Sequence, residues 1–263
     1  MKTHLVTALL LISVGFAHAT TLSYLRFEEG SGYGAYDETG LLNGEVLFGD
    51  VTPGGGDSGY SGWSTNVPSA TVLQTGEVNI GSLHYDAGEY VDLSNANALS
   101  LGFEFTIELF MKPDMPITAS PLFGFSPVSG LSYMLSETDD NLFFAGWFQS
   151  ELVNDSASLV LLNEWQHFAL VVDSTTYAIY INGQLQDTAS IPAGGEGPYW
   201  FPGNPEGGRM VGDGFRGWID EFRISDEALS PSQFLNAAIP EPGTLGLLGL
   251  GAILVAIRKR TRA

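Results

Sequence analysis

A three-strand pattern in residues 165–187 constrains the fold more than any other part of the chain. Residues 168–172 form an unbroken apolar run, and residues 177–181 form a second run of aromatic and β-branched side chains. Asn182 and Gly183 follow directly. Asn-Gly between two such runs favours a type I′ turn, in which both central residues have positive φ. Three antiparallel strands with no helical period between them predict an all-β sandwich.

Alternating side chains predict another strand at residues 103–112. One face would hold Phe103, Phe105, Ile107 and Leu109, and the other Glu104, Thr106, Glu108 and Phe110. Glu104 and Glu108 share a face, but four residues of strand separate them by roughly 13 Å. Retaining and inverting glycosidases need carboxyl groups about 5.5 Å and about 6.5–9.5 Å apart. We therefore expect both glutamates to face solvent or border a groove.

Glycine and proline mark the long connections. Residues 49–76 are predicted to be a surface loop with a short hairpin around Trp63, and residues 191–213 the longest loop after residue 150. Further strands are expected at residues 22–27, 90–93, 131–136 and 141–148, the last two paired as a hairpin.

Residues 1–19 have the features of a secretory signal peptide. Lys2 precedes an apolar segment over residues 5–16, and Ala17-His18-Ala19 supplies a cleavage site, which we place after Ala19. The apolar segment is shorter than the ~20 residues that a membrane-spanning helix requires. The chain therefore divides into a signal peptide (1–19), one domain (20–236) and a C-terminal segment (237–263).

The central domain is strongly acidic. Of the 30 acidic and 10 basic residues of the chain, 29 acidic but five basic residues lie between residues 20 and 239. A negative field of this size repels phosphate backbones, which argues against nucleic acid as a partner. The chain has no cysteine, so we expect sheet packing rather than disulfides to stabilise the exported domain.

Four ordered blocks resemble the laminin-G-like domains of the concanavalin A-like lectin and glucanase superfamily. They are residues 24–32 (YLRFEEGSG), 90–93 with 105–110, 165–183 and 215–224 (FRGWIDEFRI). The resemblance implies a two-sheet antiparallel jelly-roll sandwich. It is specific for the fold and not for an activity, because one fold hosts many functions.

The C-terminal segment joins three parts in a fixed order. Pro240, Glu241 and Pro242 precede an apolar stretch over residues 245–257 and a basic cluster over residues 258–262. This order resembles the PEP-CTERM sorting signal of Gram-negative bacteria, one branch of which is labelled an ice-binding protein C-terminus. The resemblance implies Sec export, an inner-membrane intermediate, cleavage by an exosortase-type protease and delivery to the cell surface or biofilm matrix.

The length of the apolar stretch is consistent with a transient anchor. Thirteen residues of helix cover about 20 Å, less than the ~30 Å hydrocarbon core of a bilayer. The basic residues would stop the chain on the cytoplasmic side and leave the domain outside. A permanent C-terminal anchor that is never cut is the alternative.

The resemblance also implies one Ca²⁺ held by loop carboxylates. By position, Asp37 and Asp220 match the family's ligands, although Leu41 stands where the family usually has Asn and Asn43 is displaced. The alternative is that Asp220 and Glu221 bond loop N–H groups instead of a metal.

Tyr199 and Trp200 are the candidate ligand-binding residues. Proline and glycine flank them, so we expect them in a loop, where exposed rings could stack on sugar faces. The alternative is that they pack over the open end of the sandwich. Trp147 and Trp218 are expected in the core.

No sequence pattern of a known catalytic site is present. The glucanase pattern Glu-x-Asp-x-x-Glu, the His-Glu-x-x-His motif and the Gly-x-Ser-x-Gly elbow are all missing. We expect His167 to be a packed structural residue. The sequence thus predicts a non-enzymatic module that binds polysaccharide or another surface component. A glycan-active enzyme and a purely structural matrix or adhesion protein remain as alternatives.

Overall fold

The computed structural model describes residues 19–47, 62–86, 90–92, 99–114, 120–124, 132–135, 143–145, 151–153, 161–191, 199–201, 209–210 and 215–237. Within these ranges the chain forms antiparallel strands and one 3₁₀ turn, Pro231–Gln233. The all-β prediction is confirmed. None of the described segments is a helix with the length and apolarity needed to cross a membrane. The predicted signal peptide up to residue 18, the sorting triplet at 240–242 and the apolar stretch at 245–257 lie outside the described residues.

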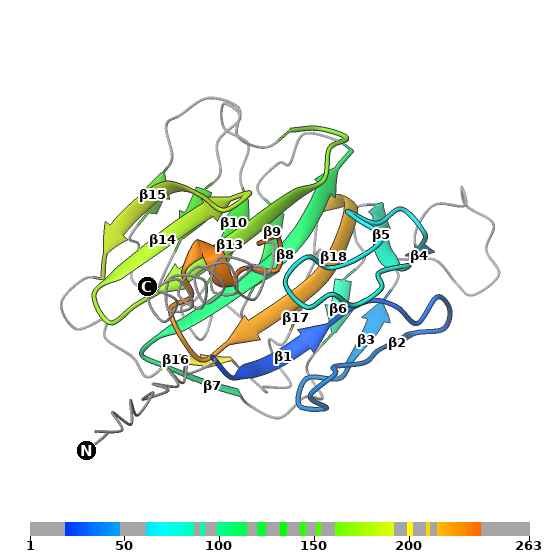
Figure 1. Ribbon diagram of the computed structural model, residues 1–263, viewed down its shortest axis with the longest axis horizontal. Coiled ribbons are helices and arrows are strands. Elements are labelled where there is room, and N and C mark those ends of the chain that lie inside the picture. The colour runs from blue at the N-terminus through cyan, green and yellow to red at the C-terminus, as the bar shows by residue number, and fades with distance from the viewer. Residues whose placement is uncertain are drawn as a thin grey trace, which may run out of the picture.

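An eight-stranded antiparallel sheet forms the larger layer (Figure 1). Its strands, in spatial order, are β15 (Gln184–Ser190), β14 (Thr176–Ile181), β13 (Gln166–Val172), β8 (Phe105–Pro113), β18 (Arg216–Ser225), β5 (Ser82–Asp86) and β4 (Gly62–Ser64), with β1 (Thr21–Leu25) also paired to β18.

The remaining strands form smaller sheets. Four strands pair in the order β17 (Arg209–Met210), β6 (Tyr90–Asp92), β3 (Gly44–Leu47) and β2 (Gly34–Ala35). The two-stranded sheets are β9 (Ser120–Gly124) with β10 (Ser132–Leu135), β11 (Phe143–Ala145) with β12 (Glu151–Val153), and β7 (Leu99–Gly102) with β16 (Tyr199–Phe201). Val46 and Val91 share one buried core with Leu109 and Phe222 of the large sheet, so the layers enclose a common interior.

The predicted turn at Asn182 and Gly183 is confirmed. Both residues have positive φ, 51° and 77°, as a type I′ turn requires. The turn joins β14 to β15, and β14 also pairs with β13, so the three strands form the predicted meander.

Two local predictions are wrong. Gly62–Ser64 pairs with β5, which lies beyond the expected loop, in place of a hairpin around Trp63. The loop expected over residues 191–213 contains the short strands β16 and β17, which pair with β7 and β6. In both cases the partner strand lies outside the short-range pattern. The hairpin expected between residues 131–136 and 141–148 has its turn outside the described residues and stays a prediction; β10 also pairs with β9, and β11 with β12.

Both faces of the central strand β8 are buried. Phe105, Ile107 and Leu109 point into the common core. Residues 226–237, which we call the covering segment, cross the outer face of the large sheet in front of β13 and β8 (Figure 1). The Leu229 N–H donates to Thr106 Oγ1 at 2.9 Å, and the Leu235 N–H donates to Glu108 Oε2 at 2.8 Å.

Candidate functional site

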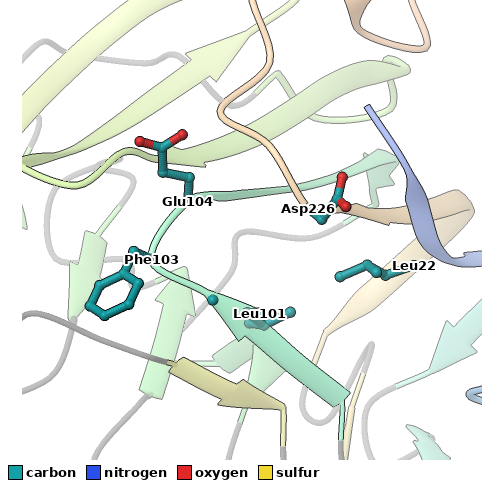
Figure 2. Close-up of a pocket in the computed structure, with 6 residues that line it drawn as sticks. Leu22, Leu101, Phe103, Glu104 and Asp226 are labelled. Carbon is teal, nitrogen blue, oxygen red and sulfur yellow. The ribbon is translucent and has the colours of Figure 1, made fainter. Parts of the chain in front are cut away.

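An open surface depression of about 400 Å³, which we call the cavity, lies where the turn before β8 meets the beginning of β1 and the end of β18. Its lining residues are Leu22, Leu101, Gly102, Phe103, Glu104 and Asp226. Gly102 has φ 69°, which lets the chain turn sharply between β7 and β8. Figure 2 shows the result: Phe103 and Glu104 lie at the tip of this turn, with Leu22 and Asp226 across from them.

Exposed side chains line one side of the cavity, and a hydrogen-bonded carboxylate lines the other. Phe103 is 51% exposed although it is a large apolar residue, and Glu104 is also exposed. Asp226 is fixed by reciprocal bonds with Thr20. The Thr20 N–H donates to Asp226 Oδ1 at 2.7 Å, and the Asp226 N–H donates to the Thr20 carbonyl at 3.1 Å. The cavity therefore combines an accessible aromatic ring with two carboxylates.

The strand that holds the predicted ligand-binding residues lies beside this cavity. Tyr199 and Trp200 belong to β16, not to a loop, and β16 pairs with β7, with Tyr199 opposite Gly102 and Trp200 opposite Ser100. Gly102 is itself a lining residue. No local pattern connects residues 99–104 with residues 199–201, which are far apart in the chain. A ligand-binding role for Tyr199 and Trp200 stays a prediction.

The carboxylate of Asp37 is saturated with hydrogen bonds. Oδ1 accepts from the N–H groups of Tyr24 and Thr39 at 2.7 and 3.0 Å. Oδ2 accepts from the Thr39 hydroxyl and from the N–H groups of Leu41 and Leu42 at 2.7, 3.1 and 2.7 Å. Burial opposes ionisation, but these donors outweigh it and lower the pKa of Asp37. Asp37 organises its own loop and leaves neither oxygen without a donor.

Asp220 lies in a different environment. It is fully buried; Oδ2 accepts from Asn79 Nδ2 at 2.8 Å, while Oδ1 has no partner among the described residues. Burial, together with the charge of Glu221, raises the pKa of Asp220 well above its ordinary value. In the described part of the chain, no group of three or more His, Asp and Glu side chains is arranged to hold a metal ion. Calcium binding by Asp37 and Asp220 stays a prediction.

A β-bulge places Glu221 on the same side of the sheet as Asp220. The pairing of β18 with β8 shifts register between Asp220 and Arg223, and Glu221 has φ 53°. The extra residue in the bulge turns Glu221 outward. There its buried carboxylate contacts Tyr24 and Arg26. Side chains thus bond both carboxylates: Asn79 bonds Asp220, and Tyr24 and Arg26 bond Glu221.

We expect Asp220→Asn to be more stable than the wild type at pH 7 by about 1 kcal/mol or more. Because folding raises the pKa of Asp220, protonation of Asp220 stabilises the folded state. This contribution is complete below about pH 3.9, the pKa of an aspartate in the unfolded chain. That stability is lost as the pH rises through the folded pKa. The gain should therefore shrink as the pH approaches 4. Urea unfolding across pH 4–8 measures it, with Glu38→Gln, an exposed carboxylate, as the control; a pH-independent difference would contradict the assignment.

Glu108, His167 and Arg223 form a buried cluster of ionisable side chains, which we call the ionic cluster. Sequence analysis predicted only the structural role of His167. Glu108 is 0% exposed, so the expectation that it faces solvent or a groove is wrong. Its Oε1 accepts from Arg223 Nε at 2.8 Å and contacts Arg223 Nη2, and its Oε2 lies 2.7 Å from His167 Nε2. Burial opposes its ionisation, but Arg223 and His167 outweigh it and lower the pKa of Glu108. The covering segment closes this cluster off, which supports the structural role predicted for His167.

Trp218 is half-buried on the outer face of the large sheet, not in the core as predicted. Lys112 Nζ lies 5.0 Å from its ring centroid, and the His84 ring lies 4.4 Å from it. Its indole N–H donates to Ser64 Oγ at 3.1 Å. Trp147 lies outside the described residues.

Two family models match the sequence. One, described as the Concanavalin A-like lectin/glucanases superfamily, matches residues 86–234. The other, the PEP-CTERM protein-sorting motif, matches residues 238–260. A comparison with curated proteins found no match.

Several solved structures share the fold. Domain 4 of AbnA, an extracellular arabinanase from Geobacillus stearothermophilus solved in complex with arabinotriose, is 18% identical with a TM-score of 0.56; the match covers 82% of this chain and 96% of that one. The binding domain of Paraclostridial Mosquitocidal Protein 1 is 16% identical, with a TM-score of 0.53 and coverages of 81% and 50%. The ligand-binding domain of botulinum neurotoxin serotype D, in complex with N-acetylneuraminic acid, is 15% identical, with a TM-score of 0.51 and coverages of 81% and 49%. This chain thus spans about half of each toxin chain.

Proposed function

Because this chain belongs to the Concanavalin A-like lectin/glucanases superfamily and carries a PEP-CTERM sorting motif, we propose that it is an exported module that binds carbohydrate at the cell surface or in the extracellular matrix. The sorting motif indicates an exported protein that an exosortase processes at the membrane. The Gram-negative surface location and transient insertion through residues 245–257 belong to the proposal.

The cavity beside Phe103 is the observation that carries this proposal. Its volume lies within the range of small-ligand sites. The half-exposed Phe103 ring offers an apolar face for the C–H side of a sugar. Glu104 and Asp226 offer acceptors for sugar hydroxyl groups. The proposed site extends along β7 to Tyr199 and Trp200 of the neighbouring strand.

Two structural relatives add indirect support. The arabinanase domain was solved with arabinotriose and the neurotoxin domain with N-acetylneuraminic acid. Both are saccharides, and both proteins share this fold at low identity. We propose the same broad class of ligand here, without transferring either sugar.

We propose binding rather than hydrolysis. Glu108, His167 and Arg223 are buried, and Glu108 bonds both of the others, so these ionisable residues are closed to a substrate. Asp226, in the cavity, is engaged by the Thr20 N–H. Incubation with a polysaccharide panel should release no reducing ends; a release that Glu104→Gln or Asp226→Asn abolishes would instead establish the glycan-active enzyme.

We expect Phe103→Ala and Trp200→Ala each to weaken polysaccharide binding about 5- to 150-fold, taking for a stacked sugar the loss of about 1–3 kcal/mol found when an aromatic ring under a nucleic-acid base is removed. A glycan array run with the purified protein identifies the ligand, and titration then gives the affinity of each variant. Tyr36→Ala is the matched control, since Tyr36 is 64% exposed and does not line the cavity. Wild-type affinity in both variants would exclude this site, and an array with no ligand would favour the purely structural role.

A further inference from the structure

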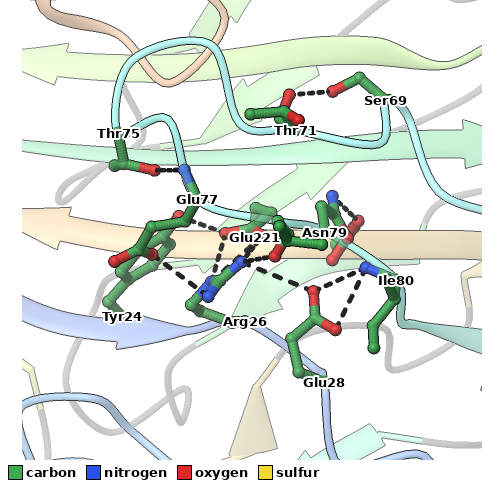
Figure 3. Close-up of polar contacts among 12 residues, drawn as sticks. Tyr24, Arg26, Glu28, Ser69, Thr71, Thr75, Glu77, Asn79, Ile80 and Glu221 are labelled. Atoms are coloured by element: carbon green, nitrogen blue, oxygen red, sulfur yellow. Dashed lines mark hydrogen bonds and ion pairs between the residues drawn. The ribbon is translucent and has the colours of Figure 1, made fainter.

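Carboxylates pair with most of the basic side chains of this acidic domain. Three glutamates lie 3.2–3.5 Å from the Arg26 guanidinium (Figure 3), and Arg216 and Arg223 each pair with one carboxylate. Lys112 is the other lysine or arginine whose side chain the structure describes, and it makes no ion pair within the described part of the chain. Its positive charge is therefore available to a ligand.

An aromatic ring holds the Lys112 ammonium in place. Lys112 is partly exposed on the outer face of the large sheet, and its Nζ lies 5.0 Å from the ring centroid of Trp218, the residue opposite it on β18. The His84 ring lies 4.4 Å from the same indole, whose N–H donates to Ser64 Oγ at 3.1 Å. A cation–π contact of this kind positions the ammonium without neutralising it.

A second tryptophan flanks Lys112 on its other side. Gln166 pairs with Met111, so Trp165, the residue before Gln166, falls beside Lys112. Trp165 is half-buried against the apolar cluster of the outer face, and its indole N–H donates to an asparagine side chain at 3.2 Å. Two strand spacings place the backbones of Trp165 and Trp218 roughly 10 Å apart. We call Trp165, Lys112 and Trp218 the Lys112 row.

The chemistry of the row fits a sugar that carries a carboxylate. Indole rings offer apolar surface to the C–H side of a sugar. An ammonium between them is a strong donor to a carboxylate. A uronic acid residue within a polysaccharide supplies both an apolar ring surface and the anion.

The acidity of the domain limits how much charge this ligand can carry. Between residues 20 and 239 there are 29 acidic and five basic residues, and their field repels a densely charged polyanion. Salt confines that field to about 8 Å at physiological ionic strength, so nearby cations still attract an isolated anion. Carboxylates separated by neutral sugars meet both conditions.

We propose that the Lys112 row is a second ligand surface, which binds polysaccharides that contain uronic acid residues. The carboxylate pairs with the Lys112 ammonium, and the neighbouring sugar rings lie against the two indoles. The row is separate from the cavity, because eight residues of strand, roughly 26 Å, divide Lys112 from Glu104. It adds to the proposed function and does not depend on the cavity.

Titration of the exported domain with gellan, xanthan and hyaluronate, in which neutral sugars separate the uronic acids, tests the proposal. At least one should bind, with an affinity that falls as NaCl is raised. Its methyl-esterified form should bind at least about tenfold more weakly. Lys112→Met should cause a similar loss, since it removes a charged hydrogen-bond donor.

Lys112→Arg is the matched control, because it keeps the positive charge and should keep most of the affinity. Trp165→Ala should weaken binding as well, and thermal melting checks that this variant is folded. No binding to any of the three polymers would overturn the proposal, as would an affinity unchanged by esterification or by Lys112→Met. If Phe103→Ala abolished the binding and Lys112→Met did not, the uronate would lie in the cavity. That result would overturn the second surface and leave the proposed function standing.

Discussion

Glu108→Gln should lower the free energy of unfolding by about 3–5 kcal/mol, because it leaves the partner charge of a buried pair uncompensated. Arg223 is 9% exposed and has Glu108 as its carboxylate partner. The substitution also weakens the acceptor of the Leu235 N–H, which fixes the covering segment. Urea unfolding followed by tryptophan fluorescence measures the change.

The pH dependence of this loss distinguishes the effect of the missing Glu108 charge from other effects of the substitution. The pKa of Glu108 is lowered in the folded state, so its contribution is complete above about pH 4.3, the unfolded value. It is lost as the pH falls through the folded pKa, and the difference between variant and wild type should shrink accordingly. Glu104→Gln is the control, since it changes an exposed carboxylate on the same part of the chain and should cost less than about 0.5 kcal/mol. Equal losses in the two variants would contradict the buried ionic cluster.

Gly217→Ala should destabilise the protein by about 3 kcal/mol or more, since it combines backbone strain with overpacking. Gly217 has φ 132°, and a Cβ added there would lie 2.3 Å from the Lys112 carbonyl and 2.8 Å from Pro113 Cα. Both are backbone atoms of the paired strand β8, which cannot move aside without breaking the sheet. Thermal melting and urea unfolding of the variant provide the measurement.

Gly40→Ala distinguishes crowding from backbone strain. Gly40 also has positive φ, 74°, but a Cβ there meets nothing within 4 Å. Gly40→Ala should lower the free energy of unfolding by only about 1–2 kcal/mol, the penalty for a side chain in the left-handed region. If Gly217→Ala cost no more than Gly40→Ala, the close approach of β18 to β8 would be wrong.

The predictions that succeeded rest on short-range patterns. The Asn182–Gly183 turn and the alternation along residues 105–111 each involve residues within a few positions of one another, where backbone sterics and the two-residue period of a strand decide the structure. The family resemblance over separated blocks then supplied the sandwich, which the family match at residues 86–234 confirms.

The predictions that failed depend on contacts between distant segments. The second face of β8 was expected to face solvent because it carries Glu108, but residues 226–237 cover it. The sequence around Asp220 does not reveal the β-bulge that brings Glu221 into contact with Arg26, which lies almost 200 residues earlier in the chain. In the cavity, pairing of β7 with β16 likewise brings together segments that no local rule connects.

The covering segment has a bearing on how this protein could leave its membrane. Its last described contact is the bond from the Ala237 N–H to the Phe234 carbonyl, and the matched sorting motif begins at residue 238. Cleavage near Pro240 would thus remove the tail and leave the whole covering segment in place over the ionic cluster. On the proposed function, cleavage there would release a domain that needs no refolding, because every described contact of the covering segment would stay in place.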